Sequence, residues 1–588
     1  MTQSRLTRTD RWLALLLFVG TFSALGLAQR DQGVMRDEGT YFQAAEHYWG
    51  WFAELGDNLK AGRFKASFTP ASIGRYWGTN NEHPVLFKTL FAFSWRAFHR
   101  CECTKKGAQY HPLAYDKPHK TLGWLSEISA FRLPGWLFYA LAVVLVFLLG
   151  VQLEHRTAGL TAALLYATLP QAFFHGQLAC FDSGVTTCWL LVVYAYVRSL
   201  TAARWGIYAG LLFGVALAAK HNAWFLPPLL LLHYLAVVRP DLSLRPLRLP
   251  RVPLAFLAMA LLGPLVFFAH WPWLWFETRA HLEGYFGFHL HHAYYNMEYL
   301  GTNWGPPPLP VSYPFGMTLF TAPVVLQALG LVGLLIYARA PLYALLERFT
   351  AFRAPVEPDL FRFPAKRTWL RPGLGLNPRP GLLFFVNALF PLALIAHPKV
   401  PIFGGTKHFM PAFPFLALLA GVAVARLCGW LADQGRARWA GIALPLLLAL
   451  PGATSTALTH PFGLSQYNAL AGGPAGGADL GLNRQFWGYA PRQLLPWMNE
   501  TLPRNSRVYF HDLSHDSYGA YLRDGLLRPD IVYSGMELPA IEASTHALVI
   551  YELHFNKYDY WIWNAFGTVR PEKVLTLDGV PLVAFYKR

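Results

Sequence analysis

The chain has 588 residues, of which 54% are hydrophobic and only 14% are charged, and it carries a formal net charge of +17. So apolar a composition excludes a protein that is water-soluble throughout its length. The basic residues stand mostly in short segments between apolar runs, as in membrane proteins with positively charged cytoplasmic loops. We therefore attribute the charge to membrane topology and expect no nucleic-acid partner.

About eleven apolar runs are candidates for helices that cross a hydrocarbon core of about 30 Å. They lie at 12–29, 132–152, 157–179, 184–200, 204–219, 223–238, 253–270, 315–337, 381–396, 408–426 and 439–457. The first run follows several arginines but lacks a small-x-small cleavage site, so we expect a retained helix and not a signal peptide. The pattern predicts a mainly α-helical, polytopic membrane protein.

The basic segments indicate an orientation. If the N-terminus is cytoplasmic, the segments that contain Arg156, Arg198 and Arg426 fall on the cytoplasmic side, and the chemically interesting residues fall on the external side. The shorter run at 85–98 carries two basic residues, and counting it as a span would reverse every later segment. We therefore assign it to a juxtamembrane helix within a first external loop over 30–131.

After residue 457 the composition becomes that of a soluble domain. Predicted strands lie at 507–510, 531–533, 547–551 and 581–586, and predicted helices lie near 491–501 and 517–523. The dipeptide Asp578-Gly579 is a hairpin turn signal. The sequence thus predicts two parts, a membrane-embedded domain over 1–457 and a small external α/β domain over 458–588.

Two acidic positions stand out at the expected external surface. The pair Asp37-Glu38 follows the first apolar run, where a carboxylate is placed to act as a general base on a lipid-carried substrate. The alternative is structural, because acidic residues also favour the first turn of a helix. Asp182 stands between two apolar spans, and it either serves function or caps the helix that follows.

Positive charge and imidazole groups occur at two further external positions, His83 with Lys88 and Lys407 with His408. A cation and an imidazole at the external end of a span suit a phosphate or pyrophosphate-like group. The alternative for Lys88 is that it only extends toward lipid phosphates.

A third external segment is rich in histidine and tyrosine. His289 and His292 have the i, i+3 spacing of one helical face and are candidate ligands of a divalent metal. No acidic residue stands at a fixed spacing from them, so the metal signal is weak, and interfacial aromatic packing is the alternative.

Several of these motifs together resemble the C-type superfamily (GT-C) of integral-membrane glycosyltransferases. The motifs are the acidic pair, the HPxLFK string at 83–88, the segment 169–182, the histidine-rich stretch that ends at 299–301, and the string GGTKHFMP at 404–411. The resemblance covers most of the first 470 residues. It is strongest to bacterial relatives of the dolichyl-phosphate-mannose protein mannosyltransferases and of the lipid A aminoarabinose transferase.

The resemblance implies an enzyme of the bacterial inner membrane, with its active site and C-terminal domain in the periplasm. It would transfer a sugar from a polyprenyl-phosphate carrier to an acceptor hydroxyl of a protein, lipid or glycan, with inversion. By this resemblance Asp37 would be the general base, and Glu38 would position it or help to bind a metal. Asp182 would shape the site or share a cation. The leaving lipid phosphate would be stabilised by His83, Lys88, Lys407 and His408. The cofactor stays open, with a divalent metal as one option.

Two other functions are alternatives to this enzyme. A transporter or flippase would use Asp182 and Lys220 along a translocation path. The sequence shows no paired inverted halves, and the ionisable residues fall at one external rim. A scaffold or sensor that binds glycans through its C-terminal domain is the third option, but about eleven spans exceed what an anchor requires.

Overall fold

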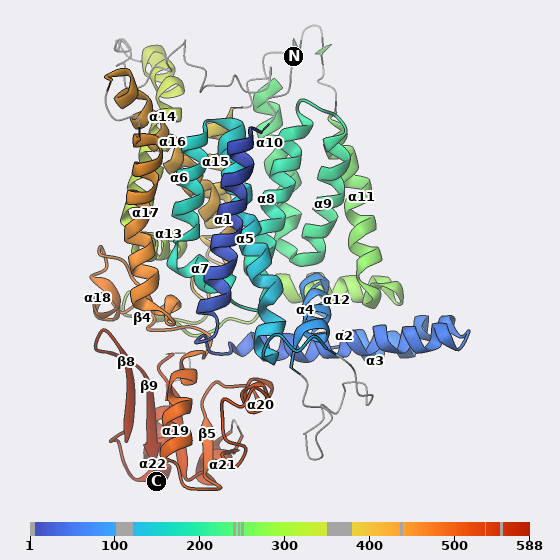
Figure 1. Ribbon diagram of the computed structural model, residues 1–588, viewed down its shortest axis with the longest axis vertical. Helices are drawn as coiled ribbons and strands as arrows, with labels where there is room; N and C mark the ends of the chain where they lie inside the picture. The colour runs from blue at the N-terminus through green and yellow to red at the C-terminus, as the bar shows by residue number, and fades with distance from the viewer. Residues whose placement is uncertain are drawn as a thin grey trace.

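The computed structural model describes residues 6–100, 121–238, 243–244, 247–248, 252–349, 379–435, 439–535, 537–552 and 557–588. Within these ranges the chain forms a helical bundle, a layer of further helices across one end of the bundle, and a small domain built around a mixed sheet (Figure 1). The mainly α-helical class with an α/β C-terminal part is therefore confirmed.

Each apolar run of the sequence contains helix. The long elements of the bundle are α1 (Arg8–Ala28), α5 (Glu127–Leu153), α6 (Arg156–Ala167), α8 (Phe181–Ser199), α9 (Trp205–Ala219), α10 (Leu226–Val238), α11 (Leu254–His270), α14 (Val324–Phe349), α15 (Pro380–Ile395), α16 (Phe413–Asp433) and α17 (Ala440–Thr459). Figure 1 shows them side by side, with the start of α1 at one end and the sheet domain beyond the other.

By length and composition alone, fewer helices qualify as membrane spans than the sequence predicts. Four pass in the described part of the chain, and up to six pass if two sharply bent pairs each count as one span. The pairs are α7 (Pro170–Gly176) with α8, bent by 102°, and α13 (Tyr313–Thr321) with the start of α14, bent by 119°. Helices α9, α11 and α15 are apolar but shorter. The number eleven thus stays a prediction.

The predicted single span at 157–179 is wrong. Helix α6 ends at Ala167 and α7 begins at Pro170. Proline has no backbone N–H and its ring clashes with the preceding turn, so it favours the first turn of a helix, as Pro170 does here, although α5, α11, α15 and α17 each hold a proline in their interior. The chain therefore turns at this point and presents α7 and the start of α8 at the end of the bundle.

Ion pairs show which helix ends share one side of the bundle. Arg156 Nε lies 2.6 Å from Asp10 Oδ1, which joins the starts of α6 and α1. Arg426 Nη2 lies 3.9 Å from Glu154 Oε2, which joins the ends of α16 and α5. These residues therefore gather at one end, as expected if the spans alternate in direction and the segments with Arg156 and Arg426 fall on the same side. Helix α2 and the sheet domain lie at the other end (Figure 1).

The helices across that other end come from two segments and are short apart from α2, which has 25 residues. Between α1 and α5 lie α2 (Arg36–Lys60), η1 (Phe64–Phe68), α3 (Pro70–Trp77) and α4 (Leu86–Phe98), and after α11 come η4 (Pro272–Trp275) and α12 (Thr278–Leu290). Helix α2 runs across the bundle end and projects sideways (Figure 1). The helix predicted at 85–98 is α4, which packs on α2 and α5.

Shorter elements complete the membrane-embedded part and lead out of it. They are η2 (His221–Phe225), β1 (Ser243–Leu244), β2 (Leu247–Arg248), β3 (Met297–Tyr299), β4 (Thr302–Trp304), η6 (Lys407–Ala412), η7 (Gly463–Ser465) and α18 (Gly473–Asp479). The segment after α17 remains attached to the bundle, because Asn468 Nδ2 donates hydrogen bonds to the carbonyls of Leu319 and Ala322 at 2.7 and 2.6 Å.

The C-terminal domain contains η8 (Ala490–Leu494), α19 (Leu495–Thr501), β5 (Arg507–Phe510), α20 (His515–Arg523), β6 (Val532–Tyr533), α21 (Leu538–Glu542), β7 (His546–Ile550), α22 (Lys557–Phe566), β8 (Lys573–Leu577) and β9 (Val580–Lys587). The strand order is β6-β5-β7-β9-β8, with β6, β5 and β7 parallel and the last two pairings antiparallel. The turn predicted at Asp578-Gly579 joins β8 to β9, and both residues have the positive φ that such a turn needs.

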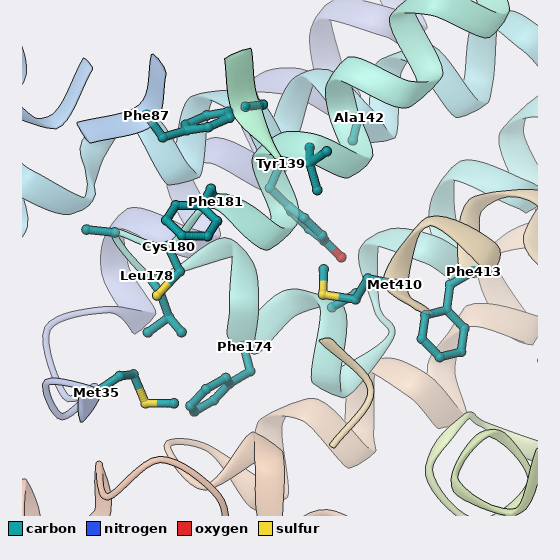
Figure 2. Packing of buried hydrophobic residues seen from close by; sticks show 14 of the residues in the cluster. Met35, Phe87, Tyr139, Ala142, Phe174, Leu178, Cys180, Phe181, Met410 and Phe413 are labelled. Carbon is teal, nitrogen blue, oxygen red and sulfur yellow. The ribbon is translucent and has the colours of Figure 1, made fainter. Parts of the chain in front are cut away.

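The apolar core reaches the end of the bundle that carries the short helices. Figure 2 shows Met35 near Phe174 of α7, with Leu178 and Cys180 of the loop between α7 and α8 above them and Met410 of η6 to one side. All of them are almost completely buried. Burial of a large apolar side chain contributes about 1.5–3 kcal/mol, so this cluster fixes the helix ends against one another. The polar residues described next are held by these same ends.

Candidate active site

The acidic pair at the start of α2 divides into one buried and one accessible carboxylate. Glu38 is fully buried, and Arg132 of α5 donates to its two oxygens at 2.8 and 2.6 Å. The backbone N–H groups of Met35 and Ala179 donate to it as well, at 3.0 and 2.8 Å. The side chain of Asp37 is 31% exposed, and its Oδ2 lies 3.4 Å from Lys407 Nζ. Glu38 thus has a structural environment, whereas Asp37 can reach a substrate.

Lys407 begins η6 after a turn built by two glycines. Gly404 and Gly405 have φ near +65°, and a Cβ on Gly404 would come within 2.7 Å of Lys407 Cε. The lysine stem therefore lies against the glycine backbone, and any other residue at 404 would be strained by the positive φ and would have to move this stem. Its ammonium lies 3.8 Å from the ring centre of Trp487 and 4.7 Å from that of Phe403. The cation is held mainly by aromatic faces.

Asp182 and Lys220 form a second ion pair close to the same helix ends. Lys220 Nζ lies 2.5 Å from Asp182 Oδ1, and both side chains are buried. The N-cap of α8 is Cys180, so the capping role considered for Asp182 is wrong and the acid lies one position inside the helix. The Lys220 ammonium also faces the ring of Phe181 at 5.7 Å.

Imidazole rings surround this pair. His221 stacks on His289 at 3.8 Å between ring centres, and His83 lies 5.4 Å from His289. His408 meets the ring of Phe403 at 4.4 Å. Buried nitrogens without a hydrogen-bond partner occur on His83, His221, His289 and His408. Buried polar atoms normally have a partner, so these four nitrogens are available to a polar ligand.

Two of these imidazoles are held neutral by their surroundings. Burial, reinforced by the Lys88 ammonium, lowers the pKa of His83 well below its usual value. Burial together with the nearby Lys220 charge lowers the pKa of His289 to about 4. A neutral imidazole keeps one N–H donor, so each ring can still donate to an anion.

The metal interpretation of His289 and His292 has no support. Helix α12 ends at Leu290, so the two residues do not share a helical face, and His292 stacks on Phe403 at 4.9 Å instead. In the part of the chain that the structure describes, no group of three or more His, Cys, Asp or Glu side chains is placed to hold a metal ion.

Lys88 differs from the expectation of a phosphate-binding cation. Its ammonium donates to Asn80 O at 2.6 Å, Asn80 Oδ1 at 3.0 Å and His83 O at 3.0 Å. An ammonium has three donors, so these bonds use all of them. Burial lowers the pKa of Lys88 to about 7. Lys88 thus holds the 80–83 turn, and with it the backbone of His83, in place.

Sequence reasoning missed a group of residues that joins α2 to the C-terminal domain. Arg36 Nη2 lies 2.5 Å from Asp512 Oδ2 and 3.1 Å from Glu552 Oε2. Burial raises the pKa of Asp512, and it raises that of Glu552 to about 8. The position of Arg36 directly before the acidic pair is the only sequence signal for this group, because its partners follow hundreds of residues later.

Comparison with known families places the central part of the chain among membrane glycosyltransferases. Residues 125–273 match the model of the family described as dolichyl-phosphate-mannose-protein mannosyltransferase. This segment runs from α5 to the end of α11 and carries Arg132, Asp182, Lys220 and His221. The match confirms the resemblance to C-type integral-membrane glycosyltransferases that the motifs indicate.

Solved structures are similar along nearly the whole chain. ArnT from Cupriavidus metallidurans bound to undecaprenyl phosphate is 15% identical, with 97% of each chain covered and a TM-score of 0.46. The apo form of that protein gives 15% identity, 98% coverage of each chain and a TM-score of 0.48. The oligosaccharyltransferase AglB from Archaeoglobus fulgidus is 12% identical over 96% of this chain and 72% of its own, with a TM-score of 0.44. No curated protein matches the sequence.

Proposed function

We propose that the protein transfers a sugar from a polyprenyl-phosphate carrier to an acceptor hydroxyl, with inversion at the anomeric carbon. One observation carries the proposal: an accessible carboxylate, Asp37, lies beside a buried ammonium, Lys407, that keeps hydrogen-bond donors for an anion. A base and a cation so close together suit a reaction in which one oxygen loses a proton while another gains negative charge.

In the proposed reaction Asp37 accepts the proton of the acceptor hydroxyl. The resulting oxygen attacks the anomeric carbon from the face opposite the phosphate. The bond between that carbon and the phosphate oxygen breaks, and its electron pair leaves with the phosphate, which changes from a diester to a monoester. Lys407 meets this developing charge. Electrostatic stabilisation of this kind commonly lowers a barrier by about 3–4 kcal/mol.

The buried histidines extend the proposed phosphate site. The neutral rings of His83 and His289 each offer an N–H group, and His408 follows Lys407 directly. Lys220 adds a cation whose charge Asp182 balances. Lys88 acts through the 80–83 turn, and Glu38 acts by fixing the first turn of α2. The proposed steps use these donors alone, and a divalent metal remains an option for the same site.

The proposed location is the bacterial inner membrane, with the site and the C-terminal domain on the periplasmic face. The basic helix ends at the opposite side of the bundle support this orientation. A cysteine introduced at residue 31, next to the acidic pair, would test it. A membrane-impermeant thiol reagent applied to intact cells should label that cysteine, whereas protection would place the site in the cytosol.

The decisive experiment compares the purified protein with Asp37→Asn on a panel of labelled polyprenyl-phosphate sugars. We expect the parent to transfer one of them and the variant to lose at least about 100-fold in rate, as for removal of a general base. A parent that turns over none of them, or a variant with full activity, contradicts the proposal. Solute movement across proteoliposomes that is indifferent to Asp37→Asn would favour the transporter instead.

A further inference from the structure

Trp487 is carried by the segment that leads into the C-terminal domain, yet its side chain lies in the site described above. The side chain is buried, its ring faces the Lys407 ammonium, and the ring of His175 meets it at 5.3 Å in an edge-on arrangement. The backbone φ of Trp487 is +68°, in the left-handed region that bulky residues rarely adopt. Such a conformation persists only where its surroundings enforce it, and it is frequent at functional sites.

The surroundings that enforce it are Arg36, Asp512 and Glu552, which together with Trp487 we call the Arg36 clamp. The Trp487 carbonyl accepts from the Arg36 backbone N–H at 3.0 Å, and the Trp487 N–H donates to Glu552 Oε2 at 3.1 Å. The Arg36 guanidinium donates to Asp512 at 2.5 Å through two nitrogens. Both main-chain groups of Trp487 are therefore fixed by members of the clamp.

The sheet determines where the clamp lies. Asp512 and Glu552 each follow a strand, β5 and β7, and these two strands are parallel neighbours. The carboxyl ends of parallel strands meet at one edge of a sheet, so the two acids converge there. The residue after Trp487 is Gly488, where a Cβ would come within 2.8 Å of Asp512 Oδ2. Glycine at this position allows the loop to approach the acid.

The clamp reaches both groups of the proposed reaction. Arg36 directly precedes Asp37, so its side chain fixes the first turn of α2. The Trp487 ring holds Lys407 by its π face, which attracts a cation without occupying any of its N–H groups. Resting on the proposed function, we propose that Trp487 is a positioning residue for Lys407 and that the C-terminal domain, through the Arg36 clamp, completes the active site.

The first test measures Lys407 without any assay of transfer. The full-length protein and its Trp487→Leu and Trp487→Phe variants are treated with an amine-reactive ester, and labelling of Lys407 is quantified by mass spectrometry against the exposed Lys399. We expect a roughly fivefold faster reaction in Trp487→Leu, as for loss of one cation–π contact, and less than about a twofold change in Trp487→Phe. An unchanged Lys407 rate in Trp487→Leu overturns the inference. Should that variant not fold, Trp487→Met replaces it, because methionine adapts to gaps in a core.

The second test separates positioning from mere folding. If Trp487 acts through Lys407, Trp487→Leu lowers kcat in the parent but has no further effect in a Lys407→Gln background. If the two losses multiply, Trp487 acts on stability alone and the inference fails. The proposed function is tested separately. Full transfer by Asp37→Asn would overturn the role of Asp37 as general base, and the labelling of Lys407 would still decide the role of Trp487.

Discussion

The neighbouring carboxylates Asp37 and Glu38 should respond to the same amide substitution in opposite ways. Glu38 and Arg132 are both completely buried, and the guanidinium also donates to the carbonyls of Gln29, Gln32 and Gly33. Glu38→Gln keeps the shape of the side chain but leaves the Arg132 charge uncompensated. Removal of one partner from a buried pair costs about 3–5 kcal/mol. Asp37→Asn acts on a partly exposed side chain and should cost less than about 1 kcal/mol.

The assay is thermal unfolding in one detergent, followed by circular dichroism, together with the rate of sugar transfer. We expect Glu38→Gln to lower the unfolding midpoint clearly, and Asp37→Asn to keep the midpoint while losing transfer. The double variant Glu38→Gln with Arg132→Met should recover part of the loss, because no buried charge then lacks a partner. A Glu38→Gln protein with the parental midpoint would refute the structural role of the pair, and a destabilised Asp37→Asn protein would refute the division of labour.

Three further outcomes are expected. Gly404→Ala should lower transfer by at least about tenfold, since its Cβ would displace Lys407, and Gly62→Ala, which has a similar positive φ but nothing within 4 Å, is the matched control; equal effects of the two would contradict the reasoning. Lys88→Met should lower the unfolding midpoint, because it leaves the acceptors of the 80–83 turn unpaired at about 1–3 kcal/mol each, and an unaltered midpoint would argue against the turn-holding role. The pKa of Glu552 is raised to about 8, so the stability that its protonated form contributes is complete below its ordinary pKa near 4.5 and is lost as pH rises through 8. The thermal unfolding midpoint of the parent should therefore fall between pH 5 and 9, and that of Glu552→Gln should fall less steeply. Parallel curves of midpoint against pH for the two proteins would contradict the assignment.

The sequence predicts the helical elements well because their signal is local. A run of apolar residues specifies a helix in a membrane wherever it stands, and every such run contains one. The break before α7 is harder to predict, because Pro170 starts that helix whereas α5, α11, α15 and α17 continue through prolines in their interior. The strands of the C-terminal domain follow from alternation in the same way, and Asp578-Gly579 marks their hairpin.

The site is only partly predictable. Consecutive spans run in opposite directions, so counting them along the sequence already places Asp37, Asp182 and Lys407 at the same end of the bundle. Glu38 and not Asp37 is the buried carboxylate of the pair because it binds Arg132, which lies almost a hundred residues later in the sequence. The residues around the pair give no sign of this partner. The same holds for Arg36, whose partners are separated from it by 476 and 516 positions. Ionic partners at such distances depend on the tertiary fold.

The partners of Lys88, Lys220 and Lys407 determine what each lysine can do. Lys88 donates to three oxygens, so an incoming phosphate would have to displace hydrogen bonds already made. Lys220 is neutralised by Asp182 at 2.5 Å. Lys407 faces two rings and, within the described residues, has a single and long hydrogen bond to Asp37. A cation–π contact of about 0.5–2 kcal/mol holds the ammonium in place yet leaves its donors for an anion. Of these lysines, Lys407 is therefore the one whose charge an incoming anion can use at least cost, and its aromatic partner Trp487 comes from the segment that leads into the C-terminal domain.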